Sequence, residues 1–359
     1  MKELKVLSLF DGISCGMVAL ERAGIPVKKY VAYEIDKYAI QISKKNYPEI
    51  RHKGDVFNGD FTKYKGCDLL IGGSPCTYWS IAKREREITP DGIGGQLFMQ
   101  YVRALHESGA KYFLYENNYS IHKDIKDFIS EQLGVQPIMI NSALVSAQQR
   151  KRCYWTNIPG VTQPEDRGIL LKDILEGAVG WQDKAYCMTS SSSYDGAVLW
   201  NTLERKQRTM VAEPVKQVGE PINTDEGKSR TIKAQYQQTS IANLVRQDGY
   251  DATGVAEPVR LGHIGKSDGQ ANRVYSVRGK SVCLQSQSGG GGAKTGLYKI
   301  DLPDGDYIIR KLTPVEAERL QTLPDNYTEG VSNSQRYKCI GNGWTVEVIA
   351  HILRNIKEE

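Results

Sequence analysis

The segment KVLSLFDGISCGMVALERAG, residues 5–24, decides the fold class. Residues 5–10 form an apolar run that predicts a strand, residues 11–16 a turn of small residues, and residues 17–23 a helix closed by Gly24. This succession lets a doubly wound α/β fold bring its backbone close to a nucleotide-like ligand. The turn lacks the Gly-x-Gly-x-x-Gly pattern, which disfavours a nicotinamide or flavin cofactor, and a turn without any ligand stays the alternative.

A second strand over residues 31–34 ends in Glu34. A doubly wound fold places a carboxylate there to accept hydrogen bonds from ribose hydroxyls, whereas a solvated surface Glu is the alternative. Asp36 is expected as the cap of a helix over residues 37–45. Asp55 is a weaker candidate for the rim of the same ligand site.

Cys76 lies just beyond the short apolar run of residues 68–71, in a loop that begins with Gly72 and Gly73 and contains Pro75. Chemistry in open α/β sheets gathers outside the carboxyl ends of strands. A thiol at this point is therefore a candidate nucleophile, and a small buried hydrophobic residue is the alternative.

Glu116 ends another buried strand, residues 112–115. Parallel strands that are joined by a helix, here residues 97–106, bring their ends side by side, so we expect Glu116 near Cys76. The charged, Gly-rich stretch 84–95 before that helix is expected to be a surface loop, with a substrate-closing lid as the alternative.

Residues 148–152, QQRKR, precede a strand-like segment over residues 153–157. If they are extended, Gln148, Arg150 and Arg152 share one face, because alternate side chains of a strand point the same way. An exposed basic strand is the alternative. The segments between Glu116 and these residues predict a helix over 125–133 and a strand over 138–145.

The composition bounds the class of protein. The 359 residues are 40% hydrophobic and 25% charged, which is ordinary for a soluble globular chain with one large or two ordinary domains. A net charge of +5 is compatible with a polyanionic partner without requiring one. Seven cysteines without a Cys-x-x-Cys pair predict neither disulfides nor a zinc site. No long apolar run or signal pattern is present, so we expect a cytoplasmic protein.

From about residue 181 the chain becomes rich in Gly, Ser, Thr and Gln, with short β-type runs. Residues 227–235 are partly repeated at 279–287, which suggests two related hairpin-like units. Residues 288–296 predict a flexible glycine loop, and their spacing disfavours a phosphate-binding loop. Between residues 181 and 310 there are 17 Lys and Arg against 14 Asp and Glu, a mixture suited to phosphate and base-edge contacts.

Together these stretches resemble the DNA (cytosine-5) methyltransferases. The matching stretches are LFDG (9–12), YE (33–34), GD (54–55), GSPC (73–76) with Ser80, EN (116–117), QQRKR (148–152), RKLTPVEAERLQ (310–321) and GNGWTV (341–346). They occur in the family's order over nearly the whole chain. Three residues depart from the pattern, namely Ser14, Thr77 and Asn118, and they put details of the cofactor loop and of the packing beside Glu116 in doubt.

The resemblance implies a Rossmann-like α/β domain over residues 1–180 that binds S-adenosylmethionine. It implies a smaller, mostly β or irregular target-recognition domain over 181–333, with a helix that begins at Thr313, and a return to the first domain over 334–359. A strand over residues 344–346 and a helix over 346–356 are expected there. By the same resemblance, the cofactor-binding residues are Phe10, Asp11, Gly12, Ser14, Glu34, Ile35, Asp55, Val56, Pro75, Asn342, Trp344 and Val346.

The implied mechanism begins with addition of the Cys76 thiolate to C6 of a cytosine that has been flipped out of duplex DNA. Glu116, kept partly protonated in a dry site, would donate to ring N3 and hold the exocyclic amine. Arg150 and Arg152 would hold the base O2 and the adjoining backbone. We expect a monomer in a bacterial or phage-infected cell, with no metal and no membrane partner.

Three other classes of protein remain as alternatives. An RNA cytosine-5 methyltransferase would share the chemistry, but its relatives usually have a much smaller recognition region. A DNA-binding relative without catalysis is disfavoured by the presence of Cys76, Glu116 and the two arginines. A dinucleotide oxidoreductase is disfavoured by the absence of the glycine fingerprint.

Overall fold

The computed structural model describes residues 2–79, 86–177, 184–185, 210–214, 260–263, 273–276, 297–302 and 305–356. Contacts divide the chain into two compact units, the first comprising Met1–Ser193, Ala197–Val211 and Lys311–Glu359, the second Tyr194–Gly196 and Ala212–Arg310. The expected recognition domain extended to residue 333, whereas the first unit resumes at Lys311. The role of residues 181–333 in target recognition stays a prediction.

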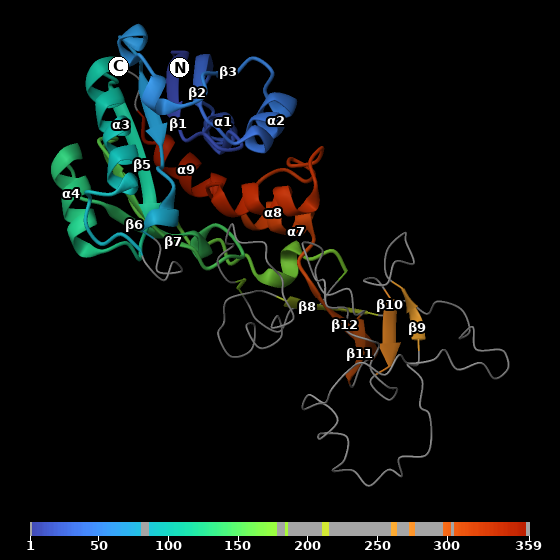
Figure 1. The fold of residues 1–359 in the computed structure, drawn as a ribbon. Helices are drawn as coiled ribbons and strands as arrows, with labels where there is room; N and C mark the ends of the chain where they lie inside the picture. The colour runs from blue at the N-terminus through green and yellow to red at the C-terminus, as the bar shows by residue number, and fades with distance from the viewer. Residues whose placement is uncertain are drawn as a thin grey trace, which may run out of the picture. The chain divides into compact units, whose positions relative to one another are not determined.

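The first unit is built on a seven-stranded sheet with the order β3-β2-β1-β4-β5-β7-β6. Figure 1 shows this sheet with all of its strands labelled except β4. Its strands are β1 (Leu4–Leu9), β2 (Val27–Tyr33), β3 (Arg51–His52), β4 (Leu69–Gly72), β5 (Tyr112–Asn118), β6 (Ile138–Asn141) and β7 (Lys151–Thr156). Strands β1 to β5 pair in parallel, and β7 pairs antiparallel with both β5 and β6. The predicted doubly wound, mostly parallel sheet is thereby confirmed.

Strand β4 shows why these short apolar runs form internal strands. All four of its residues are buried, as expected for a parallel strand that is covered on both faces. Leu69 and Ile71 pack into one hydrophobic cluster and Leu70 into the other, because successive side chains of a strand point to opposite faces.

Helices cover both faces of this sheet. Among the described residues, the helices of the first unit are α1 (Cys15–Arg22), α2 (Lys37–Asn46), α3 (Ile93–Ser108), α4 (Lys123–Leu133), α7 (Pro314–Leu320), α8 (Asn333–Asn342) and α9 (Val346–Leu353). Helices α1, α2 and α9 contribute to one hydrophobic cluster, and α3 and α4 to the cluster on the opposite face. In the described part of the chain, no helix combines the length and the apolar character needed to cross a membrane.

The strand order reverses between β1 and β4. The chain leaves β1 for β2 on one side and later returns to β4 on the other side. The register pairs Leu9 with Gly72, so the carboxyl ends of β1 and β4 lie side by side. In doubly wound sheets, ligands bind in the crevice at this point.

At several points the local structure differs from what the sequence predicts. Residues 344–346 do not form a strand, because Val346 is the first residue of α9. Helix α8 was not predicted, because its sequence is mostly polar and its buried residues Tyr337 and Ile340 give only a weak hydrophobic periodicity. The loop expected over 84–95 ends earlier, because α3 begins at Ile93, where the Glu87 carboxylate accepts hydrogen bonds from the first helical amides.

Helix α7 begins as its sequence predicts, with Thr313 as the cap and Pro314 at the first position. Thr313 Oγ1 accepts a hydrogen bond from the amide of Glu316 at 3.1 Å, and the Glu316 carboxylate accepts one from the amide of Thr313 at 2.7 Å. This reciprocal pair satisfies two helix-end donors.

We expect Thr313→Val to lower the free energy of unfolding by about 1 kcal/mol, because valine cannot accept the capping hydrogen bond. Urea unfolding would measure the change, with Thr313→Ser as the control that keeps the oxygen. Equal stability of the two variants would contradict the assigned role of this cap.

Among the described residues of the chain, five strands form a second sheet with the order β8-β12-β11-β10-β9. They are β8 (Met210–Pro214), β9 (Arg260–His263), β10 (Arg273–Ser276), β11 (Leu297–Leu302) and β12 (Gly305–Lys311). Short β-type runs were predicted in this part of the sequence. The partial repeat at 227–235 and 279–287 and the glycine loop 288–296 lie outside the described residues.

Candidate active site

A cleft of about 180 Å³ opens at the carboxyl ends of β1 and β4. Its walls come from the turn after β1, the end of β2, the loop after β4, the end of β5, the segment leading into β7 and the link between α8 and α9. The predicted site residues that line it are Phe10, Asp11, Gly12, Glu34, Pro75, Glu116, Arg150, Arg152, Asn342 and Trp344. The fold therefore brings these residues, which are far apart in the sequence, to one place.

The turn after β1 has an unusual backbone. Phe10, Gly12 and Ser14 have φ values of 58°, 61° and 61°, the left-handed region that favours glycine. The carboxylate of Asp11 holds this turn by accepting hydrogen bonds from the hydroxyls of Ser14 at 2.5 Å and Tyr30 at 2.6 Å. Burial raises the pKa of Asp11, and the hydroxyl donors oppose that rise.

Glu34 ties the end of β2 to this turn. Its Oε2 accepts a hydrogen bond from the amide of Gly12 at 2.8 Å, and its Oε1 accepts from the amides of Ile35 and Asp36 at 2.7 and 2.8 Å. Burial raises the pKa of Glu34, and the three amide donors oppose that rise. Asp36 caps α2 through hydrogen bonds from the amides of its first turn, as predicted, and also lines the cleft.

The loop after β4 runs along the cleft. Pro75 and Thr77 both line it, and the backbone of Cys76 begins a short 3-10 turn between them. The Ser74 hydroxyl is hydrogen-bonded to the Tyr115 hydroxyl at 2.6 Å, which anchors the loop on β5. The side chain of Cys76 lies outside the described part of the structure.

Glu116 lies at the same edge of the sheet, because β4 and β5 are parallel neighbours. Its Oε1 forms an ion pair with Arg152 Nε at 3.0 Å, and its Oε2 accepts a hydrogen bond from Trp344 Nε1 at 3.0 Å. The Glu116 side chain is 12% exposed and the Arg152 side chain 10%. Two fixed donors thus hold a nearly buried carboxylate beside the loop of residues 73–77, the cysteine loop.

The segment that leads into β7 alternates as predicted. Gln148, Arg150 and Arg152 are buried, while Gln149 and Lys151 are exposed. The predicted shared face is therefore confirmed, and the alternative of an exposed basic strand applies only to the other face. Arg150 and Arg152 line the cleft, whereas the Gln148 amide donates to the carbonyl of residue 320 inside the core.

Arg150 also anchors the link between α8 and α9. Its Nη2 donates to the carbonyl oxygens of Gly341 at 3.2 Å and Gly343 at 2.9 Å. The guanidinium therefore binds two backbone carbonyls of the same chain. The alternating burial of residues 148–152 did not predict this role.

Some predicted cofactor residues lie outside the cleft lining. Ile35 is 74% exposed, Asp55 accepts a hydrogen bond from the amide two residues later, and Val56 and Val346 are buried in the core. Ser14 is fully buried behind the turn.

Of the three departures from the family's pattern, Ser14 and Asn118 form hydrogen bonds and Thr77 faces the cleft. The Ser14 hydroxyl donates a hydrogen bond to the Asp11 carboxylate and is hydrogen-bonded to the Ser43 hydroxyl, which lies 2.6 Å away. Asn118 accepts a hydrogen bond from Arg152 Nη1 at 3.4 Å, and Thr77 lines the cleft.

Sequence reasoning missed several residues of the cleft wall. Gly73 and Ser74 were seen only as parts of the loop, and Cys15 and Cys339 only as cysteines. Cys339 lies on α8, the helix that was not predicted. The signal for Cys15 was available, since it lies within the predicted turn of residues 11–16.

Four free cysteines of the described chain are buried, namely Cys15, Cys67, Cys153 and Cys339. Burial raises the pKa of each thiol, to about 12 for Cys15 and Cys339 and to about 11 for Cys67. A high pKa leaves little thiolate near neutral pH, so these four are poor nucleophiles.

We expect Cys15 and Cys339 to resist iodoacetamide in the folded protein at pH 8, since about 1 in 10⁴ of such thiols is ionised there. Peptide mass spectrometry after labelling would show them unmodified, and the urea-unfolded protein is the control in which both become modified. Rapid labelling of either thiol in the folded protein would contradict the burial described here.

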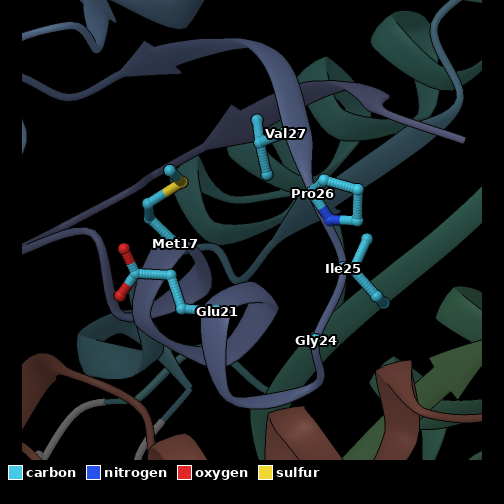
Figure 2. Close-up of a pocket in the computed structure, with 6 residues that line it drawn as sticks. All are labelled: Met17, Glu21, Gly24, Ile25, Pro26 and Val27. Atoms are coloured by element: carbon cyan, nitrogen blue, oxygen red, sulfur yellow. The ribbon is translucent and has the colours of Figure 1, made fainter. Parts of the chain in front are cut away.

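A second pocket of about 510 Å³ lies on the side of the sheet where the parallel strands begin, around the connection from α1 to β2. Figure 2 shows its wall, formed by Met17 and Glu21 of α1 and by Gly24, Ile25, Pro26 and Val27. None of the predicted site residues lies there. Of these two pockets, the cleft at β1 and β4 is therefore the one that the predicted site residues line.

Comparisons with known proteins agree with this architecture. The chain is 25% identical to the type II methyltransferase M.HhaI of Haemophilus parahaemolyticus, over 98% of this chain and 94% of that protein. It is 24% identical to the orphan methyltransferase M.SPRI of Bacillus phage SPR, over 99% and 98%.

Solved structures share the fold at low sequence identity. The Entamoeba histolytica methyltransferase EhMeth has a TM-score of 0.59 at 14% identity, covering 99% of this chain and 98% of that chain. The S. pombe Dnmt2 methyltransferase has a TM-score of 0.53 at 14% identity, covering 98% and 97%. The family model for C-5 cytosine-specific DNA methylase matches residues 4–358. This chain therefore belongs to the C-5 cytosine-specific DNA methylase family.

Proposed function

We propose that this chain transfers a methyl group from S-adenosylmethionine to C5 of a cytosine flipped out of duplex DNA, through a covalent bond between Cys76 and C6. The observation that carries the proposal is the Glu116 carboxylate, held by Arg152 and Trp344 in the cleft along which the cysteine loop runs. Membership of the family supplies the class of reaction.

The cleft fits a nucleoside-like cofactor. A Cβ atom added at Gly12 would meet nothing within 4 Å, so the backbone of the turn faces open space and a ligand can approach it closely. The Glu34 carboxylate accepts three amide hydrogen bonds and has about one lone-pair direction left for a ribose hydroxyl. Phe10, Glu34, Asn342 and Trp344 would hold S-adenosylmethionine, which when bound supplies the methyl group.

Cys76 supplies the nucleophile in this proposal. Cytosine C5 is a poor nucleophile, but addition of the Cys76 thiolate to C6 gives the ring enamine character, and C5 can then attack the methyl group. Loss of the C5 proton and elimination of Cys76 release the methylated base. The four free cysteines that the structure describes are buried and remain protonated.

Glu116 withdraws charge from the ring as the thiolate adds. It would donate a proton to N3 and accept a hydrogen bond from the exocyclic amine. Arg152 would hold the base O2 and the adjoining backbone while it is paired with Glu116. We propose the same contact for Arg150, which the structure places on the cleft wall.

The target cytosine reacts only after it leaves the stack, at a cost of a few kcal/mol. We propose that residues 181–333 read the sequence around it, since their basic and amide side chains suit phosphate and base-edge contacts. The proposed enzyme is monomeric and acts in the cytoplasm of a bacterial or phage-infected cell.

Methyl-transfer assays test this function. The chain would be incubated with methyl-labelled S-adenosylmethionine and, separately, with duplex DNA and tRNA pools. We expect label in the DNA only, and bisulfite sequencing of DNA from cells that express the chain would map the modified cytosines. Label in tRNA alone would favour an RNA enzyme, and no label in either pool would contradict the proposal.

A further inference from the structure

The link between α8 and α9 carries Trp344 into the cleft, where the indole N–H donates to Glu116 Oε2 at 3.0 Å. Arg152 Nε approaches the other oxygen, Oε1, also at 3.0 Å. Each oxygen of the carboxyl group therefore has one fixed partner, and the two partners come from different parts of the fold.

Two fixed donors restrict the rotation of the Glu116 carboxyl group, which a single donor would leave free. A carboxyl group that is held at a single oxygen can still rotate about its last side-chain bond, whose preference is broad. Donors at both oxygens fix the plane of the group and leave about one lone-pair direction on each oxygen for a ligand.

The plane of the Glu116 carboxyl group determines whether it can pair with the edge of the cytosine. The Watson–Crick edge of cytosine presents an acceptor, N3, beside a donor, the exocyclic amine. A protonated carboxyl group presents a donor beside an acceptor, so the two edges match only when they are coplanar. The Glu116 carboxyl group must therefore be held in rotation as well as in position.

Trp344 is itself firmly held. Arg150 donates to the carbonyl oxygens of Gly341 and Gly343 on either side of residue 342. The Gln321 amide donates to the Gly343 carbonyl at 3.3 Å and accepts from the hydroxyl of Thr345 at 2.8 Å. These contacts fix the backbone on both sides of the indole.

The loop that carries Cys76 packs directly against the hydrogen-bonded pair of Glu116 and Trp344. A Cβ atom at Gly73 would lie 3.0 Å from Glu116 Oε2 and 3.4 Å from Trp344 Nε1. It would also lie 2.9 Å from the backbone oxygen of Glu116. Only glycine leaves room for the pair at this distance, so the loop that carries the nucleophile and the Glu116–Trp344 hydrogen bond are in contact.

We propose that Trp344 is a positioning residue whose indole N–H fixes the plane of the Glu116 carboxyl group against the edge of the flipped cytosine. This inference rests on the proposed function, because it assigns Glu116 a contact with the base. Trp344 thus orients a group that contacts the cytosine, in addition to forming part of the cleft wall.

The test replaces only the N–H group. Site-specific incorporation of β-(3-benzothienyl)alanine at position 344 keeps the shape of the indole and puts sulfur in place of the donor. With saturating S-adenosylmethionine and a duplex that carries the mapped target, we expect kcat to fall roughly 10- to 100-fold, as for a misoriented catalytic group. The dissociation constant of S-adenosylhomocysteine should change less than about threefold, because the ring is kept. Trp344→Phe also lacks the N–H group and should lower kcat as well.

Trp155 offers a matched control. Its indole N–H donates to Ser130 Oγ at 2.9 Å within the core, away from the cleft. The same analogue at position 155 should leave kcat unchanged and affect stability alone.

Two results would overturn the inference while the proposed function stands. One is an unchanged kcat for the analogue at 344 when Glu116→Gln is inactive. The other is weaker cofactor binding with an unchanged kcat, which would make the indole a wall of the cofactor site only. Retained activity of both Glu116→Gln and Cys76→Ser would instead overturn the proposed function itself.

Discussion

Replacing Cys76 by Ser is expected to lower kcat for methyl transfer to DNA by roughly 10⁴-fold or more. A serine hydroxyl is far less acidic than a thiol, so it provides almost no anion to add to cytosine C6. Without that addition, C5 stays a poor nucleophile, however well the other groups are placed. Transfer of labelled methyl groups to a duplex with the mapped target measures the loss.

A buried thiol provides the control. Cys153→Ala changes a cysteine that is 2% exposed in the core, and it should retain full kcat with a moderate loss of stability. Gel-shift binding of Cys76→Ser to the same duplex would show that the variant is folded. A kcat within tenfold of the original protein for Cys76→Ser would rule out the assignment of Cys76 as nucleophile.

Replacing Glu116 by Gln is expected to lower kcat by roughly 10²- to 10⁴-fold, the usual contribution of a general acid. Glutamine keeps the length of the side chain but has no acidic proton for ring N3. Its amide also presents a donor to Arg152 or to Trp344, both of which donate to the carboxylate in the structure. The measurement is kcat at saturating DNA and cofactor.

Glu347 is the matched control for this change. It forms ion pairs with Arg22 at 3.1 Å and Arg167 at 2.7 Å and does not line the cleft. Glu347→Gln should therefore lower stability and leave kcat unchanged. If both variants lost activity equally, the effect of Glu116→Gln would reflect general damage to the fold, and the assigned role of Glu116 would fail.

The sequence predicts the parts of the cleft that stand at the ends of strands. Phe10 and Glu34 end predicted strands, and Pro75 and Glu116 follow short apolar runs. A parallel sheet brings such strand ends to one side. The pairing of Leu9 with Gly72 and the parallel pairing of β4 with β5 confirm this reasoning for the backbone.

Contacts between segments that are far apart in the chain were not predictable in this way. Nothing near Trp344 indicates that its indole reaches Glu116, 228 positions away, because the contact depends on how α8 and α9 close over the sheet. The anchoring of the Gly341 and Gly343 carbonyls by Arg150 has the same origin. The alternation of residues 148–152 predicts which side chains are buried, but not what they meet.

Helix α8 shows a second limit. Its sequence contains Asn, Ser, Gln, Arg and Lys, and of its buried residues only Tyr337 and Ile340 are large and apolar. Hydrophobic periodicity is therefore weak, and the helix is stabilised by tertiary packing rather than by local propensity. The residues that it brings to the cleft, such as Cys339, were missed for this reason.

Covalent trapping is the most direct test of the proposal that Cys76 bonds to an extruded cytosine. A duplex with 5-fluorocytosine at the mapped target has no removable proton at C5, so methyl transfer should leave the base attached to the enzyme. With S-adenosylmethionine present, the account predicts a denaturation-resistant complex whose mass-mapped crosslink is at Cys76. An active enzyme that forms no such complex, or one crosslinked through another residue, would contradict the account.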